Sequence, residues 1–429
     1  MNVVLLSGGS GKRLWPLSND IRSKQFLQIF KREDGAYESM LQRMVRSIQK
    51  ASPAAKITIA TGRAQVSALK NQIGDAADIC AEPVRRDTFP AIALACAYLR
   101  DKREVGADEA VIVCPVDPYV DDSYFEVLQR MSAAAAEGSA ALTVMGIQPT
   151  YPSEKYGYIL GKTFCEKPTE KEAARLIKEG ALWNGGVFAF RMRYLTERTG
   201  ELTGRVSYED LLAHYDSLTK ISFDYAVAEK ETDILTIRYD GAWKDLGTWN
   251  TLTEAMPEKT VGNVMIGDRC ENVHVINDLD LPVLCMGLKD VVIALSPDGV
   301  IVSDKDQSSF IKPYVDRLDD TARYAEKSWG SFQVIDVGDH SMTIKVTLNA
   351  GHKMNYHSHS FRDETWTIIE GQGRALIDDK EIRVSPGAVV RMPRGTRHTL
   401  IADTQIRAIE VQTGDVISVE DKEKYTLPQ

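Results

Sequence analysis

The first 250 residues alternate short apolar runs with helix-like stretches, and this alternation restricts the fold more than any other feature. Four apolar runs have the length and composition of buried strands, at residues 3–6, 56–60, 110–114 and 141–146. Helical patterns separate them, including residues 91–103 and 124–137. This order predicts a doubly wound, Rossmann-like α/β domain with a parallel sheet covered by helices. In such sheets ligands bind beyond the carboxyl ends of the strands, so loops that directly follow strands are the first functional candidates.

The pattern changes in the second half of the chain. Residues 261–312 carry β-rich runs broken by Asn, Asp and Gly, which indicates either a few coils of a β-helix or a meander. Residues 313–328 are polar and charged, as in a linker or an exposed helix. From Trp329 onward strands recur between turn signals, as in a compact β-barrel or jelly roll. We therefore expect an α/β domain at 1–258, a β-rich connector at 259–315 and a barrel at 325–423.

Charge and composition exclude several classes of protein. The net charge of −9 argues against a general binder of nucleic acid or of membrane surfaces. No window approaches the roughly 18 apolar residues of a membrane-spanning helix. The first residues enter a strand without a basic region and a long apolar region, so we expect a cytoplasmic protein with no membrane partner. The scattered cysteines lack metal-site spacing and are expected to be reduced.

The first apolar run leads straight into a Gly-rich loop that carries cations. Backbone N–H groups with flanking Lys and Arg side chains suit a polyanion such as a triphosphate. The loop is not a Walker A motif, because Arg13 follows Lys12 and Leu6 stands where the first glycine should be. It is not a dinucleotide fingerprint either, because Leu14 replaces the third glycine. Such a loop suggests a nucleotide that donates its α-phosphorus.

The string GGSGKRLWPLS, followed by KQFL, closely resembles the signature of sugar-1-phosphate nucleotidyltransferases, specifically mannose-1-phosphate guanylyltransferases of the long bacterial type. The resemblance implies that Arg13 contacts the β- and γ-phosphates of GTP and that Lys24 lies near the α-phosphate. The nucleotide-binding positions that it implies are Leu6, Gly8, Gly9, Gly11, Lys12, Arg13 and Glu82.

Two carboxylates far apart in the sequence are candidate Mg²⁺ ligands. Asp117 follows the predicted strand at 110–114, and Asp245 lies in the string WKDLGTW. An aspartate at the end of a buried parallel strand points into the ligand crevice, where a carboxylate can hold Mg²⁺. Pairing Asp117 with Asp245 around one ion is implied by the resemblance. Pro118 stands where the family usually has a histidine after the first aspartate.

Four further strings resemble the family's sugar-phosphate contacts. FCEKP implies that Glu166 binds sugar hydroxyls and that Lys167 binds the sugar phosphate. YGYI and WNGGVF place Gly157 and Asn184 close to the hexose, and FDYAVAEK makes Asp224 a supporting residue. An isolated EKP is more often a solvated turn, and Asp224 fits an ordinary helix start equally well.

The segment CAEPVRRDTFPA corresponds to the family's base-recognition segment, with Glu82 as its main residue. A carboxylate is a pure acceptor and guanine offers adjacent donors at N1 and N2, so Glu82 fits guanine better than thymine or uracil. Asp87 and Phe89 replace the family's usual Asn and Ala, which leaves the strictness of GTP selection open.

The implied reaction is in-line attack by mannose 1-phosphate on the α-phosphorus of GTP, which gives GDP-mannose and pyrophosphate. Catalysis would come from positioning and charge neutralisation, with Arg13, Lys24, Asp117 and Asp245 as the catalytic residues. Two alternatives stay open: a transferase with another base or hexose 1-phosphate, and a non-catalytic sugar-nucleotide-binding protein. Retention of both metal carboxylates argues against the second.

The last quarter of the chain carries a separate set of metal ligands. Alternate residues of a strand share a face, so His357 and His359 can both point into a barrel. With Glu364 and His398 they offer N and O ligands for Zn²⁺, Fe²⁺, Co²⁺, Ni²⁺ or Mn²⁺. The spacing resembles the two motifs of the cupin family.

In the long guanylyltransferases this cupin often isomerises mannose 6-phosphate and fructose 6-phosphate. Ser360, Phe361, Thr365 and Thr399 stand where isomerases carry other polar or basic residues. Isomerase activity therefore stays an alternative beside a structural or sensory cupin. A homodimer through the connector or the cupin also stays open, because nothing in their composition establishes it.

Overall fold

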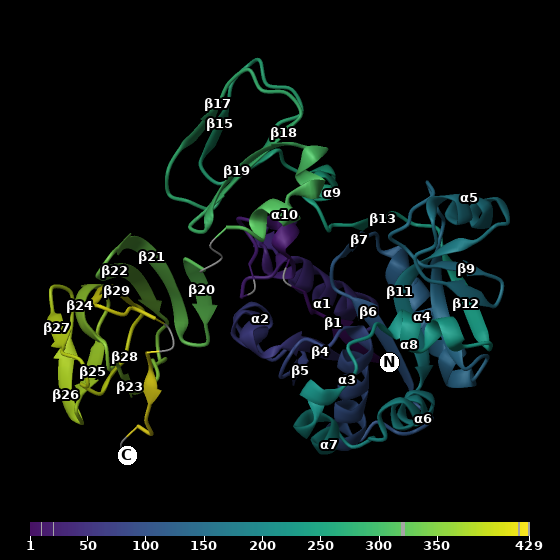
Figure 1. Cartoon of the computed structure of the whole chain (residues 1–429), viewed down its shortest axis with the longest axis horizontal. Coiled ribbons are helices and arrows are strands. Elements are labelled where there is room, and N and C mark those ends of the chain that lie inside the picture. Colours follow the sequence, from purple (N-terminus) through teal and green to yellow (C-terminus); the bar gives the residue numbers. More distant parts are fainter. Residues whose placement is uncertain (10, 20, 319–321, 419–420, 428–429) are drawn as a thin grey trace. The chain divides into compact units, whose positions relative to one another are not determined.

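The computed structural model describes residues 1–9, 11–19, 21–318, 322–418 and 421–427 (Figure 1). The chain forms two compact units. The first contains Met1–Leu14, Ser23–Lys259 and Asp304–Ile311. The second contains Trp15–Arg22, Thr260–Ser303 and Lys312–Gln429.

The first unit is built on one large sheet in the order β10-β9-β11-β6-β1-β4-β5, with β8 beside β11 and β12 beside β8. Its strands are β1 (Asn2–Leu6), β4 (Lys56–Gly62), β5 (Asp78–Glu82), β6 (Ala110–Pro115), β8 (Leu142–Ile147), β9 (Tyr158–Leu160), β10 (Thr163–Cys165), β11 (Leu182–Arg191) and β12 (Ile234–Tyr239). The strands β5, β4, β1 and β6 run parallel, as expected.

Helices cover both faces of this sheet. Along β1, Val3 and Leu5 pack into one apolar cluster and Val4 packs into the other, as the alternation of side chains in a strand requires. The helices are α1 (Met40–Ala51), α2 (Val66–Ile73), α3 (Thr88–Arg103), α4 (Ser123–Glu137), α5 (Glu170–Lys178), α6 (Met192–Thr203), α7 (Tyr208–Ala213), α8 (Phe223–Ala226) and α9 (Trp249–Ala255). The predicted doubly wound α/β fold is confirmed.

Two strands, β11 and β10, differ from the prediction of a parallel sheet, and β10 runs antiparallel to β9. β11 runs antiparallel to β6, β8 and β9, so the sheet is mixed. The sequence pattern predicts the order of strands and helices along the chain. The direction of each strand depends on where its connection returns to the sheet.

The strands of the β connector pair as in the coils of a β-helix rather than as in a meander. β14 (Thr260–Val261), β16 (His274–Asn277) and β18 (Val291–Ser296) pair in parallel, and β15 (Val264–Ile266) pairs in parallel with β17 (Val283–Cys285). β19 (Gly299–Asp304) lies beside β18. A meander would pair its successive strands antiparallel, so the parallel pairs favour coils of a β-helix.

The expected linker at 313–328 is partly a strand. α10 (Lys312–Val315) is followed by β20 (Tyr324–Lys327), which pairs with the first long barrel strand. The sequence pattern did not predict β20, because this edge strand carries mostly polar and charged side chains, and an edge strand needs few apolar residues. The boundaries at 258, 315 and 325 stay predictions.

The barrel consists of two sheets, β20-β21-β22-β29-β24-β27 and β26-β25-β28-β23-β30. Its strands are β21 (Gly330–Gly338), β22 (Ser341–Leu348), β23 (His357–Ser358), β24 (Arg362–Glu370), β25 (Gly373–Ile377), β26 (Lys380–Val384), β27 (Val389–Met392), β28 (His398–Ala402), β29 (Ile406–Gly414) and β30 (Glu423–Lys424). One apolar cluster takes residues from both sheets, among them Val346 and Leu400. In the described part of the chain, no helix combines the length and the apolar composition needed to cross a bilayer.

Candidate functional site

Buried polar side chains hold the Gly-rich loop after β1. They bond to backbone carbonyls of the loop: Gln25 and Thr61 to Ser7, and Ser23 and Gln65 to Gly9, at 2.6–3.2 Å. All four donors are at most 3% exposed. These bonds fix the backbone at Ser7 and at Gly9, whose φ of 145° favours glycine. Motif reading missed these anchors, because Thr61 and Gln65 come from the end of β4 and beyond.

The two candidate metal carboxylates are brought together by a small strand pair. β7 (Pro118–Val120) runs antiparallel to β13 (Trp243–Asp245), and Asp245 lies opposite Pro118 in the register. Asp245 is therefore next to Asp117 across the pair. Lys24 joins them, with Nζ at 2.6 Å from Asp117 Oδ2 and 3.8 Å from Asp245 Oδ1.

The charges in this group are unequally compensated. Burial opposes the charge of Lys24, but attraction by Asp117 and Asp245 outweighs burial and raises its pKa. Burial also opposes the charge of Asp117, and Lys24 outweighs it and lowers the pKa of that carboxyl. For Asp245, burial and the nearby Asp117 raise the pKa despite Lys24 and Arg13. One lysine thus leaves the second carboxylate undercompensated, which fits a site for a divalent cation.

The exposed Arg13 lies close enough to influence both Lys24 and Asp245 electrostatically. It belongs to the short helix η1 (Lys12–Leu14), which turns directly after the Gly-rich loop. Arg13, Lys24, Asp117 and Asp245 therefore form one group in the first unit. Their roles in catalysis stay predictions.

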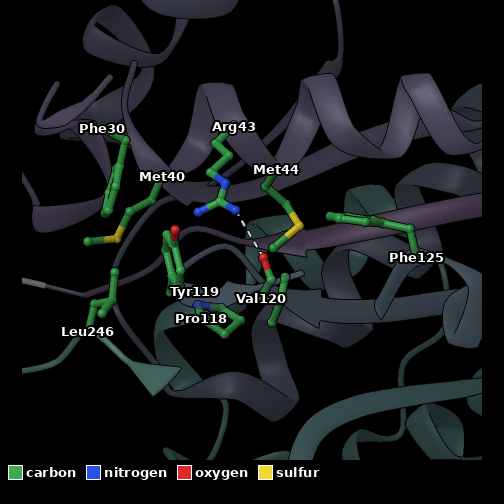
Figure 2. Close-up of a pocket in the computed structure, with 9 residues that line it drawn as sticks. All are labelled: Phe30, Met40, Arg43, Met44, Pro118, Tyr119, Val120, Phe125 and Leu246. Carbon is green, nitrogen blue, oxygen red and sulfur yellow. Dashed lines mark hydrogen bonds between the residues drawn. The ribbon is translucent and has the colours of Figure 1, made fainter. Parts of the chain in front are cut away.

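A small apolar pocket lies behind the strand that follows Asp117 (Figure 2). Pro118, Tyr119 and Leu246 line it, and Pro118 and Leu246 directly follow Asp117 and Asp245 in the sequence. Arg43 closes it from α1, with Nη2 donating to the carbonyl of Val120 at 3.0 Å and the guanidinium 4.1 Å from the Tyr119 ring centroid. This packing holds β7 in place.

The predicted base-reading residue lies at the Gly-rich loop. A Cβ on Gly8 would be 3.6 Å from Glu82 Oε1, and Tyr215 Oη donates to Oε2 at 2.8 Å. Burial raises the pKa of Glu82. Tyr215 came from outside the recognised segment, so motif reading missed it. The two residues that depart from the family pattern make contacts within the fold. Asp87 accepts from the N–H of Thr88 at the start of α3, and Phe89 is buried.

The predicted sugar-phosphate residues also meet at one place. Lys167 Nζ lies 2.6 Å from Glu166 Oε1, and Asn184 Nδ2 donates to Asp224 Oδ1 at 2.7 Å. The N–H of Asn184 donates to the carbonyl of Gly157 at 2.8 Å. Burial and repulsion by Glu166 raise the pKa of Asp224 to about 6.

One carboxylate oxygen in this cluster has no partner. Within the described residues, the buried Glu166 Oε2 accepts no hydrogen bond. It lies 2.5 Å from where a Cβ on Gly157 would be, so only glycine leaves room there. A buried, unpaired acceptor beside a side-chain-free backbone fits a ligand hydroxyl.

Aromatic rings connect the sugar-phosphate residues to Asp245. The Tyr156 ring centroid lies 4.9 Å from that of Trp183 and 5.6 Å from that of Trp243. Burial, and then Asp245, raise the pKa of Tyr156. These rings were not among the predicted site residues, although each lies within one or two residues of one: Tyr156 before Gly157, Trp183 before Asn184, and Trp243 before Asp245.

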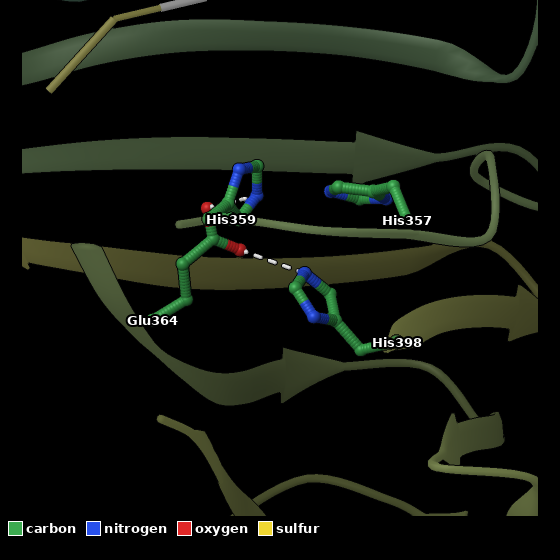
Figure 3. Close-up of side chains that lie close together, drawn as sticks. All are labelled: His357, His359, Glu364 and His398. Atoms are coloured by element: carbon green, nitrogen blue, oxygen red, sulfur yellow. Dashed lines mark hydrogen bonds and ion pairs between the residues drawn. The ribbon is translucent and has the colours of Figure 1, made fainter. Parts of the chain in front are cut away.

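The predicted ligands of the barrel, His357, His359, Glu364 and His398, form a compact buried cluster (Figure 3). Their ligand atoms all lie within 4.8 Å of one another. β23 pairs with β28 so that His357 faces His398 in the register. His359 Nε2 and His398 Nε2 lie 2.9 and 3.1 Å from the two oxygens of Glu364.

Backbone carbonyls orient all three imidazoles. The Nδ1 atoms face the carbonyls of Asn355, Asp421 and Thr396. An Nδ1–H donor leaves Nε2 as the metal-binding atom, which is the usual arrangement in metal sites. Burial lowers the pKa of His357 to about 2, so its imidazole stays neutral, as a ligand must be. These observations fit a divalent metal.

Charged side chains surround Glu364. Arg362 Nε donates to Glu364 Oε1 at 3.1 Å, and Gln412 Nε2 donates to the same oxygen at 3.2 Å. Gln412 also donates to Glu410, whose pKa is raised to about 7 by burial and by the charge of Glu364. Two of the residues that differ from the isomerase pattern have clear environments: Phe361 is 53% exposed, and Thr399 donates to the carbonyl of Met354.

Comparisons with known proteins agree with the two-part organisation. Residues 2–261 match the family described as nucleotidyl transferase, and residues 316–426 match the one described as mannose-6-phosphate isomerase C-terminal. A mannose-1-phosphate guanylyltransferase from Sinorhizobium fredii is 29% identical over 99% of this chain and 92% of its own length. The mannose-1-phosphate guanylyltransferase RfbM of Salmonella typhimurium is 28% identical over 97% of this chain and 95% of its own length.

A solved structure from Thermus thermophilus, described as a mannose-1-phosphate geranyltransferase, is 30% identical. It superposes with a TM-score of 0.60 and covers 74% of this chain and 98% of its own. The similarity to these proteins thus extends over most of the chain.

Proposed function

Because the chain belongs to the nucleotidyl transferase family, we propose that it transfers GMP from GTP to α-D-mannose 1-phosphate and releases pyrophosphate. The observation that carries this proposal is the β7–β13 pair, which sets Asp117 and Asp245 side by side with Lys24 between them. The curated relatives that carry the guanylyltransferase name match along nearly their whole length.

In this proposal each group of residues has one task. The Gly-rich loop and Arg13 bind the β- and γ-phosphates, and Lys24 neutralises charge near the α-phosphate. Lys167 binds the sugar phosphate, while Glu166 and Asn184 orient the hexose so that a phosphate oxygen faces the α-phosphorus. Mg²⁺ would be held by Asp117 and Asp245 and would offset the negative charge of the leaving pyrophosphate.

Glu82 is the proposed reader of the base. Its Oε1 faces Gly8 of the nucleotide loop while Tyr215 holds Oε2, so one acceptor oxygen is directed to the loop and the other is fixed. An acceptor at this position favours the N1–H and N2–H donors of guanine.

A second candidate function, favoured by the buried histidine cluster, is isomerisation of mannose 6-phosphate and fructose 6-phosphate in the cupin. His357, His359, Glu364 and His398 would hold one divalent transition metal, for which Zn²⁺ suits the imidazole-rich set. The metal would polarise the sugar carbonyl.

A pyrophosphate-release screen tests the main proposal. Four nucleoside triphosphates are crossed with several hexose 1-phosphates in the presence of Mg²⁺, and the pair GTP and mannose 1-phosphate is expected to give the fastest release. A faster reaction with another pair would replace the substrates. No release from any pair would favour a sugar-nucleotide-binding protein. Conversion of mannose 6-phosphate to fructose 6-phosphate, with and without chelator, tests the cupin separately.

A further inference from the structure

The segment between the two loop cations packs with the β connector. Trp15–Arg22 separates Arg13 from Lys24 in the sequence, yet it belongs to the second compact unit together with the connector. Ser296 Oγ donates to the carbonyl of Pro16 at 2.6 Å, and both residues are buried. Gly299 faces Trp15 so closely that a Cβ there would lie 2.5 Å from the indole ring. The turn between β18 and β19 therefore holds the first half of the segment.

Asp298, in the same turn, holds the middle of the segment. Its Oδ2 accepts from Asn19 Nδ2 at 2.6 Å, and its Oδ1 accepts from the N–H of Arg323 at 2.6 Å. Asn19 in turn accepts with Oδ1 from the N–H groups of Ile21 and Arg22, at 2.8 and 2.7 Å. The side chains of Asn19 and Asp298 thus have their polar atoms engaged in one connected network.

The end of the segment is held by charge. Arg22 Nη1 lies 2.5 Å from Asp278 Oδ2, and its guanidinium lies 5.4 Å from the ring centroid of Tyr324. Lys24 follows two residues later. Another contact involves η1 (Lys12–Leu14), which precedes the segment in the sequence. η6 (Gln307–Phe310), which follows β19, packs against η1, and both elements belong to the first unit.

We infer that Ser296, Asp298 and Asp278 of the connector are positioning residues for the nucleotide loop. Arg13 and Lys24 are covalently continuous with a segment whose start, middle and end are bound by connector residues. Release of that segment would let both cations move, and small displacements of groups that neutralise phosphate weaken binding strongly. The inference rests on the proposed function for its kinetic consequence: the connector sets the affinity for GTP.

The test compares two Asp-to-Asn changes within the connector. Asp298 accepts from two donors, Asn19 Nδ2 and the N–H of Arg323. In D298N the amide oxygen can accept from only one of them, and the new NH₂ group faces the other donor, so the network loses one hydrogen bond. The matched control is D290N, since Asp290 likewise accepts from an asparagine, Asn272 Nδ2 at 2.7 Å, on an exposed part of the connector. D298N is expected to raise KM for GTP about tenfold, the size of one lost hydrogen bond, with kcat and KM for mannose 1-phosphate nearly unchanged. D290N should match the wild type.

The swap N19D/D298N supplies a rescue. In this double variant the amide at position 298 can donate to the carboxylate at position 19 and still accept from the N–H of Arg323. The carboxylate at position 19 still accepts from the N–H groups of Ile21 and Arg22, so every bond is restored. KM for GTP should return toward the wild-type value, whereas N19D alone sets two carboxylates together and should resemble D298N. Equal KM values in D298N and D290N would overturn the inference.

A measurement without catalysis separates this inference from the proposed function. Backbone hydrogen exchange of residues 11–24 should be faster in D298N than in D290N and should slow again in N19D/D298N. If wild-type protein released no pyrophosphate, the proposed function would fail and the exchange rates would still decide the inference. Identical exchange in all variants would overturn it.

Discussion

Single residues decide how charge is balanced around Asp117 and Asp245. Lys24 lies 2.6 Å from Asp117 but 3.8 Å from Asp245. One ammonium group compensates the charge of one carboxylate well. The negative charge of the other carboxylate stays less compensated, which suits a divalent cation. The same unequal balance recurs in the sugar-phosphate cluster, where Lys167 pairs with Glu166 and leaves Asp224 with a raised pKa.

Asp245→Asn is expected to abolish turnover while leaving the fold intact. The amide has nearly the shape of the carboxylate but binds Mg²⁺ poorly, so pyrophosphate release should fall by about a thousandfold or more at any Mg²⁺ concentration. Asp240→Asn is the control, because Asp240 pairs only at the surface with Arg238 among the described residues. Thermal unfolding of both variants should match the wild type. Near-normal release from Asp245→Asn would remove Asp245 from the metal site.

Asp224→Asn is expected to stabilise the protein above pH 6. The folded state raises the pKa of Asp224 to about 6, from an ordinary value of 3.8. The stability that this carboxyl contributes is therefore present below about pH 4 and is lost as the pH rises through about 6. Asparagine does not ionise and can still accept from Asn184, so the variant should be more stable by about 3 kcal/mol at about pH 7.5 and by only about 0.5 kcal/mol at about pH 4. Urea unfolding across this range measures the difference, and a pH-independent difference would contradict the assignment.

At the scale of elements, short pieces of secondary structure bring distant motifs together. The β7–β13 pair joins segments that are more than a hundred residues apart, and the loop at Gly157 meets the start of β11 through the bond from Asn184 N–H. Neither β7 nor β13 has the length or the apolar pattern of a core strand. Residues of both segments line one apolar pocket, and Arg43 donates to the carbonyl of Val120 at the end of β7 (Figure 2).

Gly157→Ala is expected to weaken binding of the sugar phosphate. The new methyl group would lie 2.5 Å from Glu166 Oε2 and 3.0 Å from the Phe164 ring, so Glu166 must move. KM for mannose 1-phosphate should rise about tenfold or more, with KM for GTP little changed. Gly62→Ala is the control, because a Cβ there meets open space. Steady-state kinetics with each substrate varied in turn would show the split, and equal changes in both KM values would argue against a sugar contact at Gly157.

At the scale of the whole molecule, the chain carries two candidate metal sites whose ligands differ in kind. The α/β unit presents carboxylates and lysine, which suit Mg²⁺ with phosphates, whereas the cupin presents buried neutral imidazoles and one carboxylate, which suit a transition metal. Trp15–Arg22, which follows the Gly-rich loop in the sequence, belongs to the second unit.

Metal removal should affect the two parts separately. Chelation followed by added Mg²⁺ should restore pyrophosphate release but lower the thermal midpoint of the cupin by several degrees, because a ligand at about 100 times its Kd stabilises by about 2.7 kcal/mol. His398→Ala should abolish the bound transition metal in elemental analysis. His352→Ala should keep it, since the exposed His352 lies outside the ligand cluster. Equal metal content in both variants would contradict the assigned ligands.

The sequence by itself determined the α/β pattern, the β-rich second half and the two sets of candidate residues. Apolar periodicity, glycine turns and the spacing of His357 and His359 are local properties, and local sequence encodes them directly. The motif strings likewise predicted a group of residues that the fold brings together: Glu166 contacts Lys167, and Asn184 contacts Asp224 and Gly157. They did not reveal Thr61 and Gln65, because a buried polar side chain that bonds to a loop carbonyl has no sequence signature.

Only the tertiary structure decided the antiparallel direction of β11, the strand β20 and the packing of Trp15–Arg22 with the connector. Each of these depends on pairing between residues far apart in the sequence. Such pairing is selected by the burial and hydrogen bonding of the whole fold, so no local pattern specifies it. The Gly-rich loop is the clearest case: its glycines and cations can be recognised in the sequence, whereas Thr61 and Gln65, which bond to its carbonyls, come from β4 and the turn after it.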